Sequence, residues 1–530
     1  MKKPWSTTIP EGSWDYIVIG SGMGGMTAAA LLAKLGKRVL VLEQHYVPGG
    51  FTHTFKRPGY SWDVGVHAVG EVTRHSMTGR LLHLLTDGRL EWASLGDHYE
   101  EFYFPDDFRI DFPNHPAQFR RNLVNAFPDE EEAIDEYLAK VREVSNGMKN
   151  HLLGRLLPKA LGGIADRLVG SDTQRWLQTC TADVVNALTD NPRLRAVFAA
   201  QWAYYGSVPS QSSFAIQALV VKHFSHGGYY PVGGSGRIAQ ELLTTVADAG
   251  GWTAIRADVD EIRISRGKAH GVQLKDGRTV EAKRVLSAAG VQSTVMRLLP
   301  EAYREQEWVH SVETLRPSKA HVCLYLGFKG DVRAAGAGSA NQWFYKTWNM
   351  EEDLWRFEDE NAEAPCLYVS FGSLKNPLHD PGPEERHTGE IITFVPYDAF
   401  EKWMDTRWKK RGAEYDQLKN TLTQRLLRQF FKHRPDLEPL LDFAELSTPA
   451  STEHFVRPVR GSIYGIEPTP ERFANPWLRP RSPVKNLFFG GSDVVSVGVI
   501  GAMMGGVLSA TTAEPTSALR LLRNVIGRRA

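Results

Sequence analysis

The chain has 530 residues, 42% of them hydrophobic and 23% charged, and a formal net charge of +1. This is ordinary composition for a globular protein, and a net charge near zero provides no bulk field for binding nucleic acid or an acidic polymer. The length predicts two to four domains. The three cysteines are far apart and form no CxxC pair, so we expect neither a zinc site nor a disulfide framework, which fits a reducing cytosol.

The start of the chain, MKKPWSTTIPEGSWDY, contains two lysines but no apolar segment. Because a secretory signal peptide needs such a segment, we expect none here. A cytoplasmic protein is the expectation, with no nucleic-acid partner and no bound metal.

A strand–turn–helix–strand unit is predicted next. The apolar run at 16–19 is typical of a central parallel strand, and Gly20, Gly22 and Gly25 then form the pattern G-x-G-x-x-G. These glycines permit a tight turn, close approach of the backbone to a pyrophosphate, and close packing of the following helix. The second strand ends in Glu43, whose carboxylate can accept the ribose hydroxyls. We therefore predict a bound dinucleotide; a Gly-rich turn without a ligand is the alternative.

The continuation favours FAD over NAD. Gly49 and Gly50 follow Glu43 by six and seven residues, and a second glycine pair lets another backbone segment approach the same ligand. Such a segment is expected beside a permanently bound FAD, whose flavin and pyrophosphate it can contact. A site that binds NAD only transiently has no clear use for this second segment. Residues 51–70 are rich in glycine, aromatic residues and histidine, which is typical of a loop that lines a ligand.

Helical patterns dominate from about residue 71 to residue 222. Within this region, residues 151–170 mix leucines with basic residues. This pattern fits a helix that lies on a membrane surface and admits a lipid, and it fits an ordinary pair of surface helices equally well. The glycines at 233–236 precede a helical pattern but follow no predicted strand, so they do not predict a second nucleotide site.

The second half of the chain contains nucleotide-binding patterns before and after a mixed region of strand-like and helical runs. Residues 254–290 alternate apolar and polar residues around turns at 266–267 and 276–277, which predicts a small antiparallel ribbon. Residues 300–480 mix strand-like and helical runs. The last 45 residues again show a nucleotide-binding pattern. Their apolar stretch at 494–510 is too short to span a bilayer readily and is rich in glycine. We expect a buried helix there rather than a membrane span.

The nucleotide-type segments thus come in three separated blocks, with other segments between them. We predict an α/β protein in which a Rossmann-like FAD-binding domain is interleaved with an α+β substrate-binding domain. The expected FAD-binding domain comprises residues 1–70, 225–300 and 480–530, and the expected substrate-binding or cap domain comprises residues 71–224 and 301–479.

Together these blocks resemble the FAD-dependent superfamily of phytoene desaturases, carotenoid isomerases and retinol saturases, whose wider group includes the amine oxidases. The motifs that carry the resemblance are Glu43-Gln44-His45 with Gly49-Gly50, DVGVH at 63–67, GGYYPVGG at 227–234, GSIYGIE at 461–467 and GGSD at 490–493. The match extends from about residue 13 to residue 515, and the carotenoid isomerase and retinol saturase branch is the most similar. It implies an FAD-binding domain of the amine-oxidase type.

The resemblance also implies FAD contacts for nine residues, each by its place in a matching motif. They are Gly20, Gly22 and Gly25 at the pyrophosphate, Glu43 at the adenosine ribose, Gly49 and Gly50 beside the pyrophosphate and flavin, Val259 at the adenine, Asp493 at the ribitol or pyrophosphate end, and Gly501 near the start of a helix aimed at the flavin. No cysteine follows Cys366, which argues against a covalent cysteinyl-flavin near the C-terminus.

In this interpretation the flavin exchanges a hydride at N5 and the protein orients a hydrophobic substrate. His67, His53 and Tyr464 are the candidate catalytic side chains; for each, a purely structural hydrogen-bonded role is an equal alternative. A histidine can donate or accept a proton near neutral pH. The sequence has no Ser–His–Asp order, no HExxH and no metal-ligand cluster that would indicate another chemistry.

The implied reaction is saturation, desaturation or cis-trans isomerisation of a C=C bond in a retinoid- or carotenoid-like polyene. Aromatic residues of the cap are expected to line the substrate tunnel: Trp202, Tyr204, Tyr205, Phe214, Trp343, Phe344 and Trp348. The alternatives are a fatty-acyl desaturase or saturase, an amine oxidase, and an FAD-free escort protein for prenylated GTPases. The complete glycine signature with Glu43 and Asp493 favours a flavin enzyme over an escort protein.

The expected partners are a hydrophobic small molecule and an external electron donor or acceptor. No second well-placed G-x-G-x-x-G unit provides for NAD(P)H, so a separate donor such as a ferredoxin, or a quinone or oxygen acceptor, is expected. No hydrophobic N-terminal anchor of the kind in animal retinol saturases is present. We therefore expect a cytoplasmic protein that is soluble or peripheral on a membrane.

Overall fold

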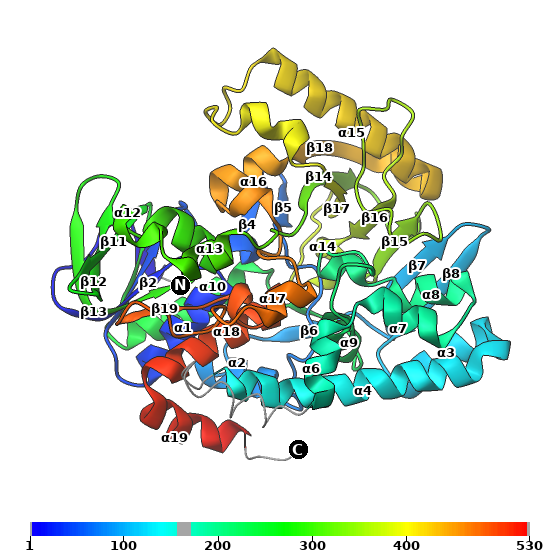
Figure 1. Ribbon diagram of the computed structural model, residues 1–530. Coiled ribbons are helices and arrows are strands. Elements are labelled where there is room, and N and C mark those ends of the chain that lie inside the picture. Colours follow the sequence, from blue (N-terminus) through cyan, green and yellow to red (C-terminus); the bar gives the residue numbers. More distant parts are fainter. Residues whose placement is uncertain (1–2, 156–170, 527–530) are drawn as a thin grey trace.

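The computed structural model describes residues 3–155 and 171–526, which form two large sheets with helices packed around them (Figure 1). The first sheet has eight strands in the order β1-β10-β3-β2-β13-β12-β11, and β19 also pairs with β13. Its strands come from the start, the middle and the end of the chain. They are β1 (Trp5–Ser6), β2 (Trp14–Ile19), β3 (Val39–Glu43), β10 (Trp252–Ile255), β11 (Val259–Ser265), β12 (Lys268–Leu274), β13 (Thr279–Ser287) and β19 (Leu487–Phe489).

The centre of the first sheet is parallel. β2 pairs in parallel with β3 and with β13, and β13 pairs in parallel with β19. All five residues of β3 are buried, which agrees with the continuous apolar run expected of a strand that is covered on both faces. β11, β12 and β13 form the antiparallel ribbon predicted from the alternating pattern of residues 254–290.

Helices α1 (Met23–Lys34) and α18 (Gly498–Ala513) pack closely on this sheet. A Cβ added at Gly506 would collide with the Gly24 carbonyl oxygen, so glycine is what lets the two helix backbones approach. α18 is largely buried, as predicted for the apolar stretch, but it begins at Gly498, three residues before the start expected near Gly501. α10 (Gly236–Asp248), α2 (Met77–Leu85) and α19 (Pro515–Ile526) complete this layer.

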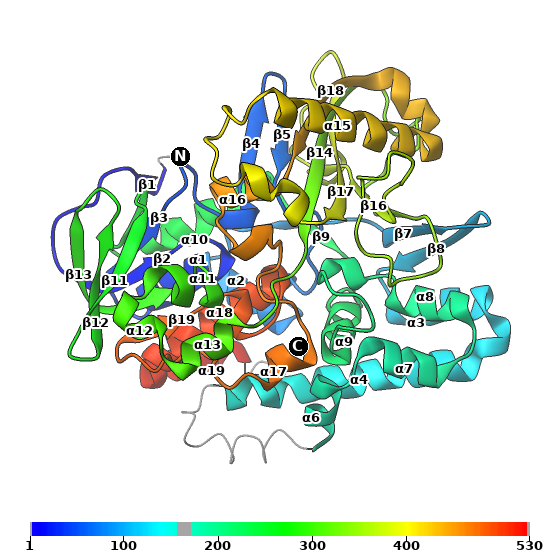
Figure 2. The ribbon, with the colours of Figure 1, turned by 45° about the horizontal axis from the view of Figure 1, so that its top comes forward.

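The second sheet has seven strands in the order β18-β14-β17-β16-β15-β7-β8. They are β7 (His98–Phe104), β8 (Phe108–Pro113), β14 (Ala320–Lys329), β15 (Asn341–Tyr345), β16 (Cys366–Ser370), β17 (Arg386–Val395) and β18 (Leu441–Ser447). One face packs on α15 (Ala413–His433), where Leu324 and Leu326 share a core with Leu422 and Phe430. Figure 2 shows α15 covering this side of the sheet.

Six strands lie where the sequence predicted helices or loops. β6 (Trp92–Ser94), β7 and β8 fall inside the region expected to be helical, and β7 has the alternating burial of a strand. β9 (Tyr229–Pro231) precedes the glycines at 233–236, but it pairs with β6 in an antiparallel fashion and so forms no second nucleotide unit. β4 (Thr54–Arg57) and β5 (Tyr60–Asp63) form a hairpin inside the segment expected to be a loop.

A layer of helices lies beside the second sheet, below it in Figure 1. It contains α3 (Pro116–Ala126), α4 (Glu131–Gly154), α6 (Ser171–Gln178), α7 (Thr181–Leu188), α8 (Pro192–Ala199) and α9 (Phe214–His223). Shorter helices connect the strands: α11 (Val291–Ser293), α12 (Glu301–Arg304), α13 (Glu307–Glu313), α14 (Gly372–Lys375), α16 (Pro449–Phe455) and α17 (Pro470–Ala474). No helix within the described ranges is long and apolar enough to span a bilayer. Most of the stretch at 151–170 considered for membrane contact lies outside the described residues.

Candidate active site

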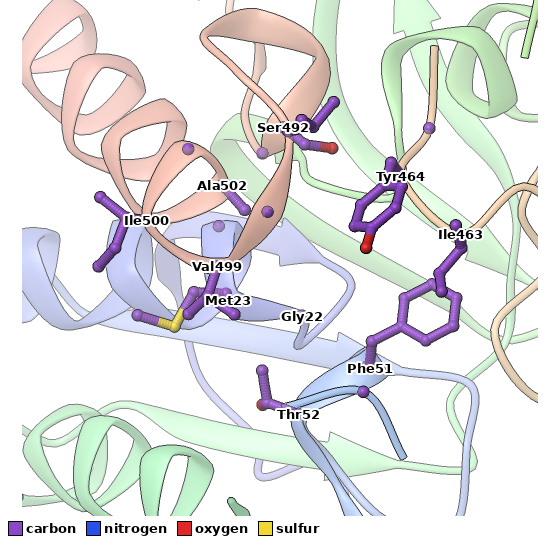
Figure 3. Close-up of a pocket in the computed structure, with 18 of the residues that line it drawn as sticks. Gly22, Met23, Phe51, Thr52, Ile463, Tyr464, Ser492, Val499, Ile500 and Ala502 are labelled. Carbon is purple, nitrogen blue, oxygen red and sulfur yellow. The ribbon is translucent and has the colours of Figure 1, made fainter. Parts of the chain in front are cut away.

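A cavity of about 1740 Å³ extends from the first sheet to the second. At one end its wall contains Gly22 of the Gly-rich turn and Glu43 at the end of β3. At the other end it contains Tyr368 of β16 and Phe394 of β17. Figure 3 shows the middle of this space, where Gly22, Phe51, Tyr464 and the first turn of α18 face one another. One continuous cavity is therefore bordered by both sheets.

The glycines of the turn after β2 have two distinct functions. Gly20 has a φ of +89°, and a Cβ at Gly25 would collide with the Gly20 carbonyl oxygen. Both residues are thus required by the fold of the turn. Gly22 differs, because its φ is −66° and a Cβ there would meet no atom within 4 Å. The absence of a side chain at Gly22 keeps open a part of the cavity at the N-terminus of α1, where a phosphate is stabilised by free N–H groups.

Glu43 is fixed in the cavity wall. It is 6% exposed, and its carboxylate accepts hydrogen bonds from the Ser21 N–H (2.9 Å), the Ser21 hydroxyl (2.6 Å) and the His45 N–H (2.8 Å). A carboxylate has about four acceptor positions, so one remains for a ligand hydroxyl. Val259, at the start of β11, also lines the cavity. Glu43 and Val259, which the sequence predicts on the adenosine side of FAD, thus line the same cavity.

The backbone of the second glycine pair, Gly49 and Gly50, passes directly beside Gly22. Gly49 and Gly50 have φ values of +126° and +55°, and a Cβ at Gly50 would lie 3.0 Å from the Gly22 Cα. The Gly49 N–H donates to the Ser21 hydroxyl at 3.1 Å. Residues 49–50 and the turn with Gly20, Gly22 and Gly25 therefore lie side by side, as expected from their places in the sequence. We call this part of the cavity wall the glycine cradle.

Asp493 and the N-terminus of α18 border the cavity from the opposite side. The Asp493 carboxylate accepts from the Val291 N–H (2.7 Å) and the Ile466 N–H (3.0 Å), so it holds two backbone segments of the wall together. Gly501 lines the cavity from the first turn of α18, and a Cβ there would collide with the Ser496 carbonyl oxygen. The dipole of α18 is directed at the cavity from Gly498 onwards.

The far wall is one face of the second sheet, and the strand register arranges its side chains in rows. Tyr325, Glu390 and Ser370 are directly paired on β14, β17 and β16, and Asn341 and Glu100 are paired on β15 and β7. These residues form a polar row. The neighbouring row two residues along is mostly apolar: Cys323, Ile392, Tyr368, Trp343 and Phe102. Ile392, Tyr368 and Trp343 of this second row line the cavity.

Buried charges stabilise one another in the polar row. Lys375 of α14 donates to the His67 carbonyl oxygen (2.8 Å), the Ser370 hydroxyl (2.8 Å) and the Asn341 side chain. Burial lowers the pKa of Lys375 to about 8. Glu100 accepts from Tyr204, Asn341 and Trp343, yet burial still raises its pKa to about 7.

His67 lines the cavity beside this row. It is 9% exposed, and its Nδ1 lies 3.4 Å from a carboxylate oxygen of Glu390, which is 1% exposed. Burial raises the pKa of Glu390, although His67 acts in the opposite direction. Neither Glu390 nor Lys375 was singled out from the sequence. The only signal was a single charged residue at the start of an apolar strand run, EIITFV.

A model of the family described as flavin containing amine oxidoreductase matches residues 23–513. The chain belongs to this family. It is 32% identical over 527 residues to all-trans-retinol 13,14-reductase of Danio rerio, a match that covers 95% of this chain and 86% of the relative. It is 26% identical over 475 residues to the chloroplastic prolycopene isomerase of Arabidopsis thaliana, covering 86% and 75%.

Among solved structures, cyclohexylamine oxidase from Brevibacterium oxydans superposes with a TM-score of 0.61 at 16% identity, covering 96% of this chain and 100% of that one. This likeness confirms the predicted fold class. FAD is the cofactor of this flavin-containing amine oxidoreductase. The residues fit it, because Gly22 leaves space at the N-terminus of α1 and Glu43 keeps an acceptor position for a ligand hydroxyl.

The other two catalytic candidates occupy different surroundings. His53 is 7% exposed, its Nδ1 bonds with the Gly50 carbonyl oxygen at 2.6 Å, and burial lowers its pKa to about 4. It is therefore neutral at physiological pH. Tyr464 lines the cavity, with its ring directed into the space that Figure 3 shows between Gly22 and Ile463. Burial raises the pKa of its hydroxyl.

The expectation that seven cap aromatics line the tunnel is mostly wrong. Tyr204 and Trp343 line the cavity, whereas Trp202, Tyr205 and Phe214 are buried in the helical core. Phe344 points to the α15 side of the sheet, and Trp348 stacks on Phe104. The aromatic residues of the lining that the sequence did not single out are Phe51, Phe224, Tyr229, Tyr368, Phe394 and Phe455.

Proposed function

We propose that this flavin oxidoreductase acts on a C=C bond of an elongated, hydrophobic polyene of the retinoid or carotenoid type, by saturation, desaturation or cis-trans isomerisation. The observation that carries the proposal is the continuity of the cavity from the glycine cradle to the apolar row of the second sheet. The names of the two relatives support this substrate class. When bound, FAD supplies two-electron chemistry as hydride exchange at N5.

The chain's own residues would select and orient such a substrate. Ile392, Tyr368 and Phe394 present a flat, apolar wall on one side of the cavity, and Phe224 adds a further ring. Rings favour a conjugated chain because it can stack on them, and the apolar wall excludes water from the reacting bond. A saturated acyl chain would gain only from burial of its methylene groups. This difference is our reason for proposing a polyene over a fatty-acyl substrate.

We further propose the roles of the cofactor residues. Gly20, Gly22 and Gly25 shape the pyrophosphate cradle, and Glu43 accepts a hydroxyl of the adenosine ribose. Gly49 and Gly50, Val259, Asp493 and Gly501 complete the wall around the cofactor. The complete cradle favours a flavin enzyme over an FAD-free escort protein.

Among the catalytic candidates, His67 is proposed as the polar group nearest the substrate. His53 and Tyr464 are proposed to border the flavin side of the cavity. We also propose the division into an FAD-binding domain (residues 1–70, 225–300 and 480–530) and a substrate-binding domain (residues 71–224 and 301–479). An external electron donor or acceptor and peripheral membrane contact are further proposals.

The test begins with the absorption spectrum of the purified protein before and after heat denaturation. A flavin spectrum that moves to the supernatant identifies noncovalent FAD. The protein is then reduced anaerobically and incubated in parallel with a retinoid, a carotenoid, an unsaturated fatty acid and an amine. Conversion of a polyene alone supports the proposal. Turnover of the fatty acid or of the amine, with all polyenes unchanged, refutes it.

A further inference from the structure

A group of buried polar atoms without hydrogen-bond partners lies in the cavity wall and next to it. Within the described part of the chain, His67 Nε2, both Glu390 carboxylate oxygens, His321 Nδ1 and the Tyr368 hydroxyl have no hydrogen-bond partner. The ring centroids of His67 and Tyr368 are 5.4 Å apart, and His67 and Glu390 approach within 3.4 Å. Of these residues, His67 and Tyr368 line the cavity. Buried polar atoms in proteins are nearly always bonded, so the free nitrogen of His67 beside the cavity indicates that its partner enters from the cavity.

The two nitrogens of His67 have different surroundings. Nδ1 faces the Glu390 carboxylate, while Nε2 is buried and free. A carboxylate at Nδ1 fixes the orientation of an imidazole and stabilises its protonated form. The His67 backbone is fixed as well, since its carbonyl oxygen accepts from the fully bonded ammonium of Lys375. The imidazole is thus held from two sides with one nitrogen left for a ligand.

We propose that His67 is the proton donor for the reaction at the C=C bond, and that Glu390 is the residue that positions it. This inference rests on the proposed function. In saturation, one carbon of the double bond gains a hydride from reduced FAD. The other carbon takes the proton from His67 Nε2, so the N–H bond breaks, the new C–H bond forms with the π electron pair, and the imidazolium becomes neutral.

Several further titratable and charged groups face this pair, and they define its electrostatic surroundings. They are Asp63 of β5, Glu100 of β7, Tyr230 of β9, His321, Cys323 and Tyr325 of β14, Tyr368 of β16 and Lys375 of α14. Burial lowers the pKa of His321 to about 4, so it adds no positive charge beside His67 at neutral pH. The charge of Lys375 lowers the pKa of Glu390 and so favours its ionised form.

The first experiment needs no substrate. Infrared spectra of the FAD-loaded protein are recorded across pH, and the C=O band of the protonated Glu390 carboxyl is assigned by its loss in Glu390→Gln. Burial raises the pKa of Glu390 and His67 lowers it. We therefore expect the band to persist to higher pH in His67→Gln than in the wild type. The matched control Glu445→Gln, at a half-buried glutamate on β18 that pairs with Arg57, leaves the band unchanged. Identical titration in the wild type and in His67→Gln overturns the coupling.

The second experiment measures turnover of a hydroxylated polyene and a hydrocarbon polyene by prereduced enzyme. We expect His67→Gln to lower kcat by about 100-fold or more for both substrates, the usual contribution of a general acid, with KM little changed. Glu390→Gln should lower kcat less, because the imidazole keeps its place in the cavity wall but loses the carboxylate that orients it. Glu390→Asp keeps the charge and should restore part of the activity.

These outcomes distinguish failure of the proton-donor role of His67 from failure of the proposed function. A rise in KM for the hydroxylated polyene alone, with kcat unchanged, would assign His67 to binding a polar end of the substrate and overturn the proton-donor role. If the flavin-loaded wild type converts no polyene, the proposed function fails, and the infrared titration still decides whether the pair is coupled. Flavin content and circular dichroism verify that each variant folds, and His67→Asn replaces His67→Gln if the latter does not.

Discussion

Replacing Gly22 with alanine tests whether the open cradle holds the FAD phosphates. The backbone at Gly22 has φ −66° and ψ 174°, which alanine adopts without strain, and the new methyl would meet no protein atom within 4 Å. Alanine is a poorer helix N-cap than glycine by some tenths of a kcal/mol up to about 1 kcal/mol. It also reduces the entropy of the unfolded chain, which stabilises by about 0.4–1 kcal/mol. The two effects offset, so the apoprotein should keep its stability to within about 1 kcal/mol.

Binding of FAD should change far more. The methyl group occupies the space that a phosphate oxygen needs beside the N-terminus of α1. Loss of one hydrogen bond to a charged group costs about 1.5–3 kcal/mol, which corresponds to a fall in affinity of about 10- to 150-fold. Titration of the apoprotein with FAD, followed by flavin fluorescence, measures this loss.

A matched control is Gly338→Ala, because Gly338 lies away from the cavity lining and a Cβ there would meet its nearest atom at 3.9 Å. It should bind FAD as the wild type does. Unchanged affinity in Gly22→Ala, with apoprotein stability also unchanged, would show that the phosphates do not lie on this turn.

Three further predictions concern packing, pH and the cavity wall. Gly506→Ala places a methyl against the Gly24 carbonyl oxygen, so denaturant unfolding should show a loss of about 1–3 kcal/mol. Burial alone would raise the pKa of Glu71, but His223 and the charge of Lys222 lower this pKa to about 2. The stability that ionised Glu71 contributes is therefore complete above about pH 4.5 and is lost as the pH falls towards 2. Lys222→Met should therefore lose less stability than the wild type between about pH 5 and pH 2; an equal loss would contradict the role of this ion pair. Ile392→Trp narrows the apolar wall and should lower turnover of long polyenes by about 100-fold while FAD affinity stays unchanged; normal turnover would place the substrate elsewhere.

The cofactor end of the site could be predicted from sequence because its residues lie in local motifs. Gly20, Gly22 and Gly25 follow directly from the strand–turn–helix pattern, and Glu43 from the end of the next strand. The start of α18 could not be placed as well, because its N-cap is Val497, which makes no side-chain cap hydrogen bond and gives no sequence signal of a helix start.

The substrate wall could not be predicted, because it depends on the register between strands distant in the chain. Trp343 and Phe344 are neighbours of similar character, yet β15 directs Trp343 to the cavity and Phe344 to the α15 side. The pairing of Glu100 with Asn341 brings together two residues that have no local relation in the sequence. Glu390 becomes conspicuous only once its neighbours across the sheet are known.

The order in which the strands occur along the chain has a consequence for how the protein is made. Tyr16 pairs in register with Arg284, 268 residues later, and Glu100 pairs with Asn341, 241 residues later. Because β19 joins the first sheet only at residues 487–489, no early segment emerging from the ribosome can complete either sheet by itself. Such long-range pairing predicts slow folding and a long exposure of unpaired strand edges. Gly22 and the start of α18 line the same cavity, so a cofactor bound there as proposed would hold early and late segments together. Supply of FAD during synthesis should then set the yield of soluble protein.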